Sequence, residues 1–391
     1  MLRPLWQNGV FVINRIYYTS RPDKLETNGQ KGCFVKNIVK DLILGIESSC
    51  DDTCACLMSF VDGHIEYNRS IHQDEIHKKF GGIVPNLASE AHLQATSILS
   101  EELKQQDLMR IACIATTTGP GLIGSLLVGV SFAKGLAMSL GLPLLRINHL
   151  EGHALSCMIE NDVEFPYLLL LVSGGNSQII LAHKLGQYTI IGQTLDDAGG
   201  EALDKIAKNL GIQYPGGVNM EKIALTAQDK NKFHFKNGCI NKQTFNFSFS
   251  GLKTQVLYKI KALGGLENIN NTDIANLAYA SQEAVFKTLT NKVEQAIYNY
   301  KHQDMEKIKS LVICGGVSAN KCLAQKMSKI SSKYNLNLIV PSLQWTTDNA
   351  GMIAKAGCMY WNAWKNDGQI FNYNPFDLSF SPVAKWEIDK I

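Results

Sequence analysis

The order of predicted strands and helices repeats along this chain of 391 residues. Apolar runs and their turn residues predict the first set of strands at 42–48, 53–60, 64–70, 110–117 and 142–148, with helices at 89–106 and 124–140 and a histidine-containing helix after 148. The second set has strands at 167–173, 177–183, 188–192, 308–316 and 336–342, with helices at 199–210, 219–228, 249–263, 272–301, 318–332 and 348–364. The pattern in each half therefore predicts three strands in a meander followed by alternating helices and strands. The second half has additional predicted helices.

This order constrains the fold. Three strands in a meander followed by alternating helix and strand units predict a mixed sheet with helices on its faces. Two such lobes side by side are typical of the duplicated actin-like ATPase and sugar-kinase fold, an α/β class whose ligands bind in the cleft between the lobes. We expect a leader at 1–40, an N-terminal lobe at 41–165, and a C-terminal lobe with a helical insertion at 166–391.

Charge is unevenly distributed. Residues 1–40 hold seven basic and two acidic residues, a net +5, so the rest of the chain sums to −2 within the total of +3. An Arg-containing leader with interspersed apolar residues and no acid before Asp23 is typical of a mitochondrial transit peptide, and the alternative is a disordered or tag-derived N-terminus. We therefore expect a mitochondrial matrix protein. We find no apolar run of the 18 or so residues that cross a bilayer, and we expect no membrane partner.

Glycine-rich turns follow several predicted strands or precede helices, at 117–124, 173–176, 214–217 and 314–320. Glycine lets backbone approach a ligand, and the N–H groups at a helix N-terminus favour phosphate. The sequence has no Walker loop, GxxxxGK[ST]. The four clusters favour a nucleotide site of the actin-like type, although a single Gly-Gly pair would indicate only a tight turn.

Two histidines, His149 and His153 in "NHLEGHA", stand one helical turn apart and can share one cation. A zinc protease would need Glu beside the first His, but Leu150 is there, and Glu151 is rotated about 200° from His149 on a helix. Asp348, at the start of the last helix, is the candidate third ligand. Two imidazoles and a carboxylate suit Zn²⁺ or Fe²⁺, with Mg²⁺ as a third option. The alternatives are surface or core histidines and an Asp that only caps its helix.

Ten ordered motifs in residues 42–364 resemble the universal tRNA threonylcarbamoyladenosine synthase family, once labelled O-sialoglycoprotein endopeptidases. They are "GIESSCDDT", "HKKFGGIVPNLASEAH", "TTGPGLIGSLLVG", "NHLEGHA", "LLVSGGNSQ", "DDAGGEALDKIAK", "YPGG", "FSFSGLKT", "CGGVSANKCL" and "TDNAGMIA". The transit-like leader makes the chain similar to the mitochondrial branch.

The resemblance implies a set of site residues. His149, His153 and Asp348 look like the ligands of one divalent metal per subunit. The residues that look like the site of an adenylate (an ATP- or AMP-type nucleotide) are Leu171, Val172, Ser173, Gly174, Gly175, Asp204, Gly217, Glu221 and Asn320. Asp204 and Glu221 would accept hydrogen bonds from ribose hydroxyls.

The implied reaction is transfer of a threonylcarbamoyl group from threonylcarbamoyl-AMP, made by a separate synthase, to N6 of the adenosine beside the anticodon in mitochondrial tRNAs that read A-starting codons. The N6 amine is a weak nucleophile, so we expect a carboxylate base among Glu47, Asp51 and Asp52, with Asp51 ranked first. The alternative is that these acids only form a solvated turn. Asp52 replaces the family's Glu, Asn86 and Glu90 replace a Glu and an Arg, and Leu171 stands where some relatives place a further ligand, Tyr.

Three other functions compete with this one. A metabolite or sugar kinase on the same fold would need no histidine pair, and a nucleotide-dependent scaffold would not need the pair for its function. The endopeptidase function ranks last, for the geometric reason given above. The expected partners are tRNA and a second copy of the chain, through apolar helices of the first lobe.

Overall fold

The computed structural model describes residues 39–391 apart from 81, 237, 239–243, 301–307 and 369, together with the backbone of three short strands near the N-terminus. Those strands pair antiparallel: β1 (Trp6–Gln7), β2 (Val10–Ile13) and β3 (Ile16–Tyr17). The chain divides into two units after Val39, and the unit Lys40–Ile391 holds both large sheets. The transit peptide predicted within 1–40 falls mostly outside the described residues and stays a prediction.

The first sheet has five strands in the order β6-β5-β4-β7-β8. They are β4 (Leu42–Glu47), β5 (Thr53–Ser59), β6 (Ile65–Ile71), β7 (Ile111–Gly119) and β8 (Leu144–Asn148). β4 runs antiparallel to β5 and parallel to β7. Its residues are buried on both faces: Ile43 packs toward the C-terminal helix, and Leu44 packs toward the helices of the opposite face. A strand covered on both sides has a continuous apolar run, as β4 does.

The second sheet repeats this topology in the order β11-β10-β9-β12-β13. Its strands are β9 (Tyr167–Val172), β10 (Ser177–Lys184), β11 (Gln187–Gln193), β12 (Ser310–Cys314) and β13 (Asn337–Ile339). β9 runs antiparallel to β10 and parallel to β12, as β4 does to its neighbours. The identical strand order confirms the predicted duplicated α/β fold.

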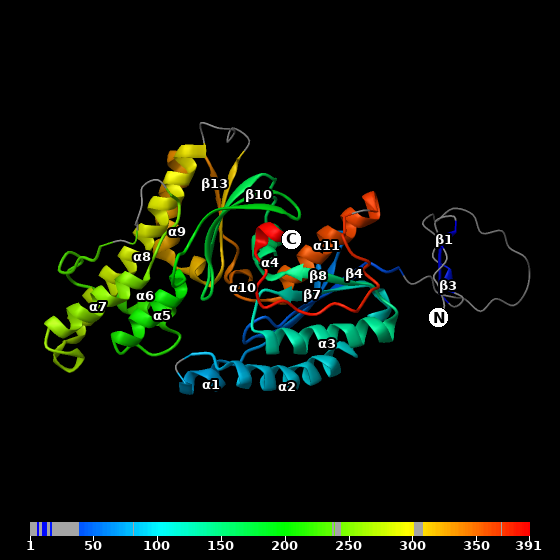
Figure 1. Cartoon of the computed structure of the whole chain (residues 1–391), viewed down its shortest axis with the longest axis horizontal. Coiled ribbons are helices and arrows are strands. Elements are labelled where there is room, and N and C mark those ends of the chain that lie inside the picture. The colour runs from blue at the N-terminus through cyan, green and yellow to red at the C-terminus, as the bar shows by residue number, and fades with distance from the viewer. Residues whose placement is uncertain are drawn as a thin grey trace, which may run out of the picture. The chain divides into compact units, whose positions relative to one another are not determined.

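The helices cover both sheets (Figure 1). In the first half they are α1 (Asp74–His77), α2 (Pro85–Leu103), α3 (Ile123–Leu140) and α4 (His149–Ser156). In the second half they are α5 (Gly199–Asn209), α6 (Gly216–Ala224), α7 (Ser250–Ala262), α8 (Asn271–Tyr300), α9 (Lys321–Lys333), α10 (Leu343–Thr346) and α11 (Ala350–Asp367). The short helices α1 and α10 were not predicted, because four residues carry too little periodicity to be recognised.

The predicted boundary after residue 165 separates the two sheets, but the C-terminal helix crosses it. α11 returns to the first lobe and packs on β4, β5 and β7. Glycines allow this close packing: a Cβ on Gly45 would lie 2.5 Å from the Ala350 carbonyl oxygen, and one on Gly357 would lie 2.7 Å from the Ala115 Cβ. The first lobe is therefore completed by residues from the end of the chain.

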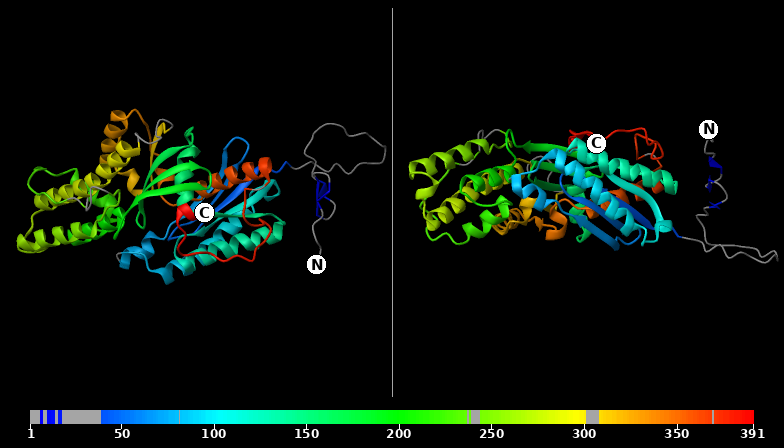
Figure 2. Two further views of the ribbon diagram at one scale, coloured as in Figure 1. Left: turned by 45° about the horizontal axis from the view of Figure 1, so that its top comes forward. Right: turned by 90° about the horizontal axis from the view of Figure 1, so that it is seen from below.

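Helix α3 corrects the expectation that no segment is apolar enough to span a bilayer. Its 18 residues have a mean hydropathy of 1.6, so α3 meets that criterion by length and composition. α3 packs against α2 and β7, while Leu127 and Met138 are exposed. Both views in Figure 2 show α2 and α3 side by side. Part of the apolar surface of α3 thus lies on the outside of the first lobe.

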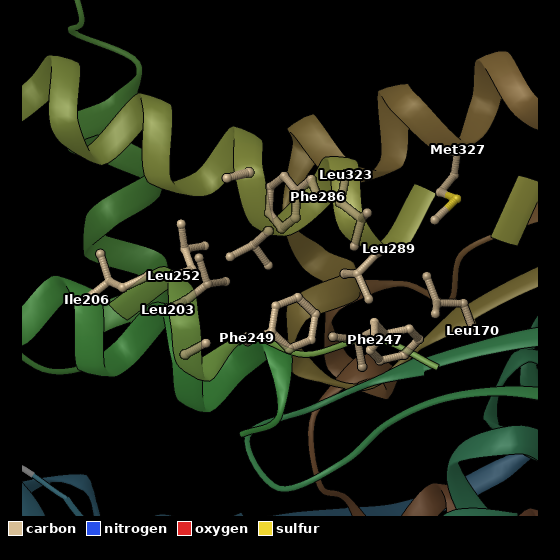
Figure 3. Close-up of a cluster of buried hydrophobic side chains, with 14 of the residues drawn as sticks. Leu170, Leu203, Ile206, Phe247, Phe249, Leu252, Phe286, Leu289, Leu323 and Met327 are labelled. Atoms are coloured by element: carbon tan, nitrogen blue, oxygen red, sulfur yellow. The ribbon is translucent and has the colours of Figure 1, made fainter. Parts of the chain in front are cut away.

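The second lobe has the larger core, which the inserted helices build (Figure 3). Phe247 and Phe249, just before α7, pack with Phe286 and Leu289 of α8 over the face of β9 that carries Leu170. The opposite face of β9 carries Leu169 and Leu171 and packs on α4. Helix α4 also contacts α11, so it lies between the second sheet and the helix that completes the first lobe.

Candidate metal centre and nucleotide site

Helix α4 begins at His149 because Asn148 caps it. The Asn148 side-chain oxygen accepts hydrogen bonds from the backbone N–H groups of Leu150 (2.9 Å) and Glu151 (3.3 Å), and its amide nitrogen donates to the Trp386 carbonyl (3.2 Å). An Asn at this position satisfies N–H groups that the helix leaves unpaired. Every residue of α4 is buried. The cap and the C-terminal segment together fix the first turn, where His149 stands.

The predicted metal ligands meet in space. The Nε2 atom of His153 lies 3.0 Å and that of His149 lies 3.6 Å from Oδ1 of Asp348. The three candidate ligand atoms lie within 4.8 Å of one another. Two imidazole nitrogens and one carboxylate oxygen converging on one point form a donor set that fits a single divalent ion and leaves coordination positions open.

Asp348 does not cap α11, which excludes the alternative considered for it. Asn349 is the N-cap residue, and its side-chain oxygen accepts a hydrogen bond from the Met352 N–H (2.9 Å). The Asp348 carboxylate is thus free to face the histidines. Burial raises its pKa, but His149 and His153 outweigh that effect and lower the pKa to about 2.

Glu47 supports the metal ligands instead of facing solvent. Its side chain is fully buried. One carboxylate oxygen accepts from the Ser49 N–H (2.6 Å), and the other accepts from the Thr117 hydroxyl and lies 3.2 Å from Nδ1 of His149. Such a carboxylate fixes the orientation of an imidazole and leaves Nε2 for the metal. Although Glu47 was predicted among the catalytic acids, its contacts are those of a residue that positions His149.

The carboxylates also make this centre favourable for a positive charge. Burial lowers the pKa of His149, but Glu47 and Asp348 outweigh it and raise the pKa to about 9. Burial raises the pKa of Glu47, but the charge of His149 and the hydrogen bonds leave it below its ordinary value. The same field that retains a proton on His149 attracts a cation, because both compete for the same position.

Asp51 and Asp52 lie in the turn after β4 and face the same region. Burial and the nearby charge of Asp348 raise the pKa of Asp51. Burial and Asp51 raise the pKa of Asp52 to about 7, although His72 Nδ1 lies 3.0 Å from the Asp52 carboxylate and opposes the shift. A carboxylate that titrates near neutral pH suits a general base. The pKa of Asp52 therefore favours it at least as strongly as Asp51.

The glycine turns of the second lobe gather at the ends of β9 and β12. A Cβ on Gly200, at the start of α5, would lie 2.6 Å from the Ser173 carbonyl oxygen, and one on Gly315 (φ +86°) would lie 2.4 Å from that of Val172. Backbone therefore packs directly on backbone. By contrast, a Cβ on Gly174 or Gly175 would meet nothing within 4 Å. The backbone of Val172 and Ser173 is therefore tightly packed, whereas Gly174 and Gly175 have open space beside them.

Leu171 and Val172 could contact the predicted nucleotide only through their backbone, and their role stays a prediction. Both side chains are fully buried, Val172 toward the large core and Leu171 toward α4. Neither side chain is placed to contact a ligand, because residues that alternate along a strand covered on both faces point into the two cores. These residues support the turn Ser173–Gly175.

The other predicted nucleotide residues tie neighbouring elements together. Oδ1 of Asp204 accepts from the Gly217 N–H (2.9 Å), and burial raises the Asp204 pKa. Glu221 of α6 accepts from the Lys321 N–H (2.9 Å) at the start of α9. Asn320 caps α9 and donates to Gln282 (3.1 Å). The residues thus sit on connected elements, α5, α6 and α9, around the glycine turns.

Two observations place the nucleotide turns near the metal ligands. The turn Gly316–Ala319 packs against α10, and a Cβ on Gly316 would lie 3.9 Å from Cγ2 of Thr347, the neighbour of Asp348. Tyr214, in the predicted turn before α6, has a pKa that is raised by burial and by the charges of Asp51 in the first lobe and Asp204 in the second. The predicted sites therefore lie near one another, where the two lobes meet.

Sequence reasoning missed the supports of this centre. Ser49 Oγ lies 3.0 Å from His149 Nδ1, and Glu151 is buried among tyrosine hydroxyls. The sequence held only one local signal for Glu151, which is an acid placed between the two histidines of "NHLEGHA". The partners lie far along the chain, so no local pattern could have named them.

Comparison with known proteins identifies the family. The sequence model of the family described as "TsaD: tRNA N6-adenosine threonylcarbamoyltransferase" matches residues 64–355. The chain belongs to the tRNA N6-adenosine threonylcarbamoyltransferase family. It is 43% identical over 354 residues to the protein of that name from Rickettsia massiliae (strain Mtu5), covering 89% of this chain and 98% of the relative. It is likewise 43% identical over 351 residues to that of Fervidobacterium nodosum, covering 88% and 98%.

Solved structures support the fold. HypF from T. kodakarensis matches with a TM-score of 0.55 and 12% identity, over 85% of this chain and 50% of the HypF chain. A full-length HypF in a phosphate- and nucleotide-bound form matches with a TM-score of 0.53 and 14% identity, over 85% and 48%. At these identities the likeness concerns the fold alone. Family membership makes this chain a tRNA-modifying transferase whose substrate is tRNA.

Proposed function

We propose that this transferase takes the threonylcarbamoyl group from threonylcarbamoyl-AMP, supplied by a separate synthase, and passes it to N6 of the adenosine next to the anticodon in mitochondrial tRNAs that read A-starting codons. The observation that carries the proposal is the packing of the turn Gly316–Ala319 against α10, which ends two residues before Asp348. It supports an adenylate bound close to a metal, where the ion could help to orient the acyl group.

The binding roles follow from the geometry. The open tips of Gly174 and Gly175 would admit the nucleotide, and Asp204 and Glu221 would accept from ribose hydroxyls. His149, His153 and Asp348 would hold a divalent ion, Zn²⁺ or Fe²⁺ by their donor set. When bound, the metal supplies a Lewis acid that polarises an oxygen of the substrate and fixes its orientation. Glu47 keeps the His149 ring turned toward Asp348.

The transfer itself is an acyl substitution. The adenine N6 attacks the carbamoyl carbon, a C–N bond forms, and the bond from that carbon to the phosphate oxygen breaks. AMP leaves with the electron pair, and the N6 proton passes to a carboxylate. Asp51 and Asp52 are the candidates, and Asp52 has a pKa of about 7. Backbone N–H groups of the glycine turns would bind the anionic AMP.

The direct test uses the full chain with threonylcarbamoyl-AMP and a tRNA transcript that carries the target adenosine. We expect modified nucleoside and AMP to form in equal amounts, as measured by mass spectrometry. Asp348→Ala should abolish both products, while Val61→Ala, a change at an exposed turn, should leave both unchanged. If folded wild-type chain formed no modified nucleoside on this tRNA, threonylcarbamoyl-AMP would not be the donor. Phosphate transfer from ATP to a sugar that chelators do not affect would instead favour the kinase function.

The mitochondrial assignment depends on the leader. Residues 1–40 carry a net +5, while the remaining 351 residues sum to −2, as expected for an import signal ahead of a near-neutral enzyme. We expect residues 1–40 fused to a fluorescent protein to direct it to the matrix and to be cleaved there. A fusion protein that stays in the cytosol would contradict this assignment. So would a full chain that still reaches mitochondria after residues 1–40 are removed.

The outer face of the first lobe is the proposed homodimer contact. Exposed Leu93 of α2 and Leu127 of α3 border a cavity of about 390 Å³. An apolar patch of this kind is typical of a surface that another protein covers. Leu127→Asp should convert a dimer to a monomer in sedimentation experiments, whereas Val61→Asp, at an exposed apolar position in the turn after β5, should not. A wild-type monomer at micromolar concentration would refute the dimer.

A further inference from the structure

Glu151 is a buried acid between the two metal histidines that the proposed chemistry does not use. Its side chain has no exposed surface. One carboxylate oxygen accepts from the Gly186 N–H (3.0 Å) and the Tyr188 hydroxyl (2.9 Å), and the Tyr360 hydroxyl lies 3.0 Å from both oxygens. Burying a carboxylate is costly unless hydrogen bonds replace its water, as they do here. Among the described residues, no Lys, Arg or His forms an ion pair with it.

The three partners come from both lobes. Gly186 and Tyr188 belong to the β10–β11 hairpin of the second lobe. Tyr360 lies on α11, the helix that begins two residues after Asp348 and completes the first lobe. Gly186 has a φ of +72°, and a Cβ there would lie 3.0 Å from the Tyr360 hydroxyl oxygen. The hairpin, α4 and α11 therefore meet at the Glu151 carboxylate.

Because Glu151 lies on the side of α4 opposite the histidines, its hydrogen bonds can control the rotation of the helix about its axis. On a helix with 100° per residue, His149 and His153 project from one side, and Glu151 projects about 200° from His149. Helix α4 has only eight residues, too few to be stable without tertiary contacts. A rotation of about 10° would move a group about 6 Å from the helix axis by about 1 Å, enough to disturb a metal site.

We infer that Glu151 is a positioning residue for the metal centre: its hydrogen bonds to Tyr188, Tyr360 and Gly186 hold α4 in the rotation that aligns His149 and His153 with Asp348. Tyr360 lies on α11, the helix that follows Asp348. Its hydrogen bond to Glu151 therefore helps to set the two histidines of α4 relative to Asp348. The inference rests on the proposed metal site.

The test measures binding of Co²⁺ alone to the metal-free full chain, by titration and by the visible absorption of the bound ion. Glu151→Ala should weaken Co²⁺ binding by about 10- to 100-fold, the usual loss for a support of a metal ligand, and should change the absorption bands. Glu151→Gln, which keeps an acceptor oxygen and the side-chain shape, should restore most of the affinity. Tyr360→Phe, which keeps Glu151 but removes one of its hydrogen bonds, should weaken Co²⁺ binding by a smaller factor. This variant tests the inference if Glu151→Ala does not fold.

A matched control separates this role from simple stability. Glu102, on α2, accepts a hydrogen bond (2.8 Å) from the hydroxyl of Tyr67 on the edge strand β6, away from the metal ligands. Glu102→Ala should lower the unfolding temperature and leave Co²⁺ affinity and spectrum unchanged. Wild-type affinity and spectrum in folded Glu151→Ala would overturn the inference while leaving the metal site intact. Failure of the wild-type chain to bind Co²⁺ would overturn the metal site and the inference together.

Discussion

Gly45 sits at the point where β4 supports the start of α11, and replacing it tests how the metal centre is built. A Cβ at Gly45 would lie 2.5 Å from the Ala350 carbonyl oxygen, 2.6 Å from the Ala354 nitrogen and 2.9 Å from the Ala354 Cα. All three are backbone atoms, so no side chain can rotate away. Gly45→Ala must instead push α11 off the sheet.

The displacement can be worked from these distances. Ordinary contact begins at 3.4 Å, so the start of α11 must move by about 0.9 Å from its 2.5 Å separation. Asp348 precedes α11 by two residues, and its Oδ1 lies 3.0 Å from Nε2 of His153. We expect overpacking to cost about 2–3 kcal/mol of unfolding free energy. We also expect Zn²⁺ or Co²⁺ affinity to fall by about 10- to 100-fold, because the carboxylate leaves the histidines.

The assay combines urea unfolding of the metal-free chain with metal titration. Gly135→Ala is the matched control: Gly135 lies within α3, and a Cβ there would meet nothing within 4 Å. In addition, Ala is a better helix former than Gly by about 1 kcal/mol. Gly135→Ala should therefore keep the metal affinity and be neutral to slightly stabilising. If Gly45→Ala matched the wild type in both measurements, the reasoning that β4 positions Asp348 through α11 would be refuted.

Three further predictions follow from individual groups. Asp348→Ala should abolish stoichiometric metal binding, whereas Asn349→Ala should keep the metal and cost about 1 kcal/mol through loss of the helix cap; equal metal contents would contradict this. Because the pKa of Asp52 rises from 3.8 to about 7 on folding, its contribution to stability is full below pH 4 and is lost as the pH rises through 7. Between pH 4 and 8, the free energy of unfolding of Asp52→Asn should therefore rise relative to that of the wild type by up to about 4 kcal/mol, as followed by thermal unfolding. If the two proteins lost stability in parallel with pH, the raised pKa would be contradicted. Gly174→Ala should leave stability within about 0.5 kcal/mol and weaken AMP binding at least about tenfold in calorimetry; unchanged AMP affinity would place the nucleotide elsewhere.

Much of the fold was predictable because it depends on local periodicity. Strands covered on both faces give continuous apolar runs, as in "LILGIE" and "YLLLLV", and the order of such runs repeats. The spacing of His149 and His153 places them on one side of a helix whatever the rest of the chain does. Four-residue helices and the return of α11 to the first sheet were not predictable, since neither leaves a periodic signal.

The chain's own sequence determined which groups could bind a metal and a nucleotide: a histidine pair at helical spacing, glycine turns after strands, and acids after β4. Only the tertiary structure decided which of them act together. Asp348 reaches His153 across 195 residues, Glu47 reaches His149 across 102, and Glu151 finds Tyr360 across 209. The reason is physical: hydrogen bonding within a helix or strand depends on neighbours in sequence, whereas contacts between elements depend on which apolar faces pack together and how closely their glycines let them approach.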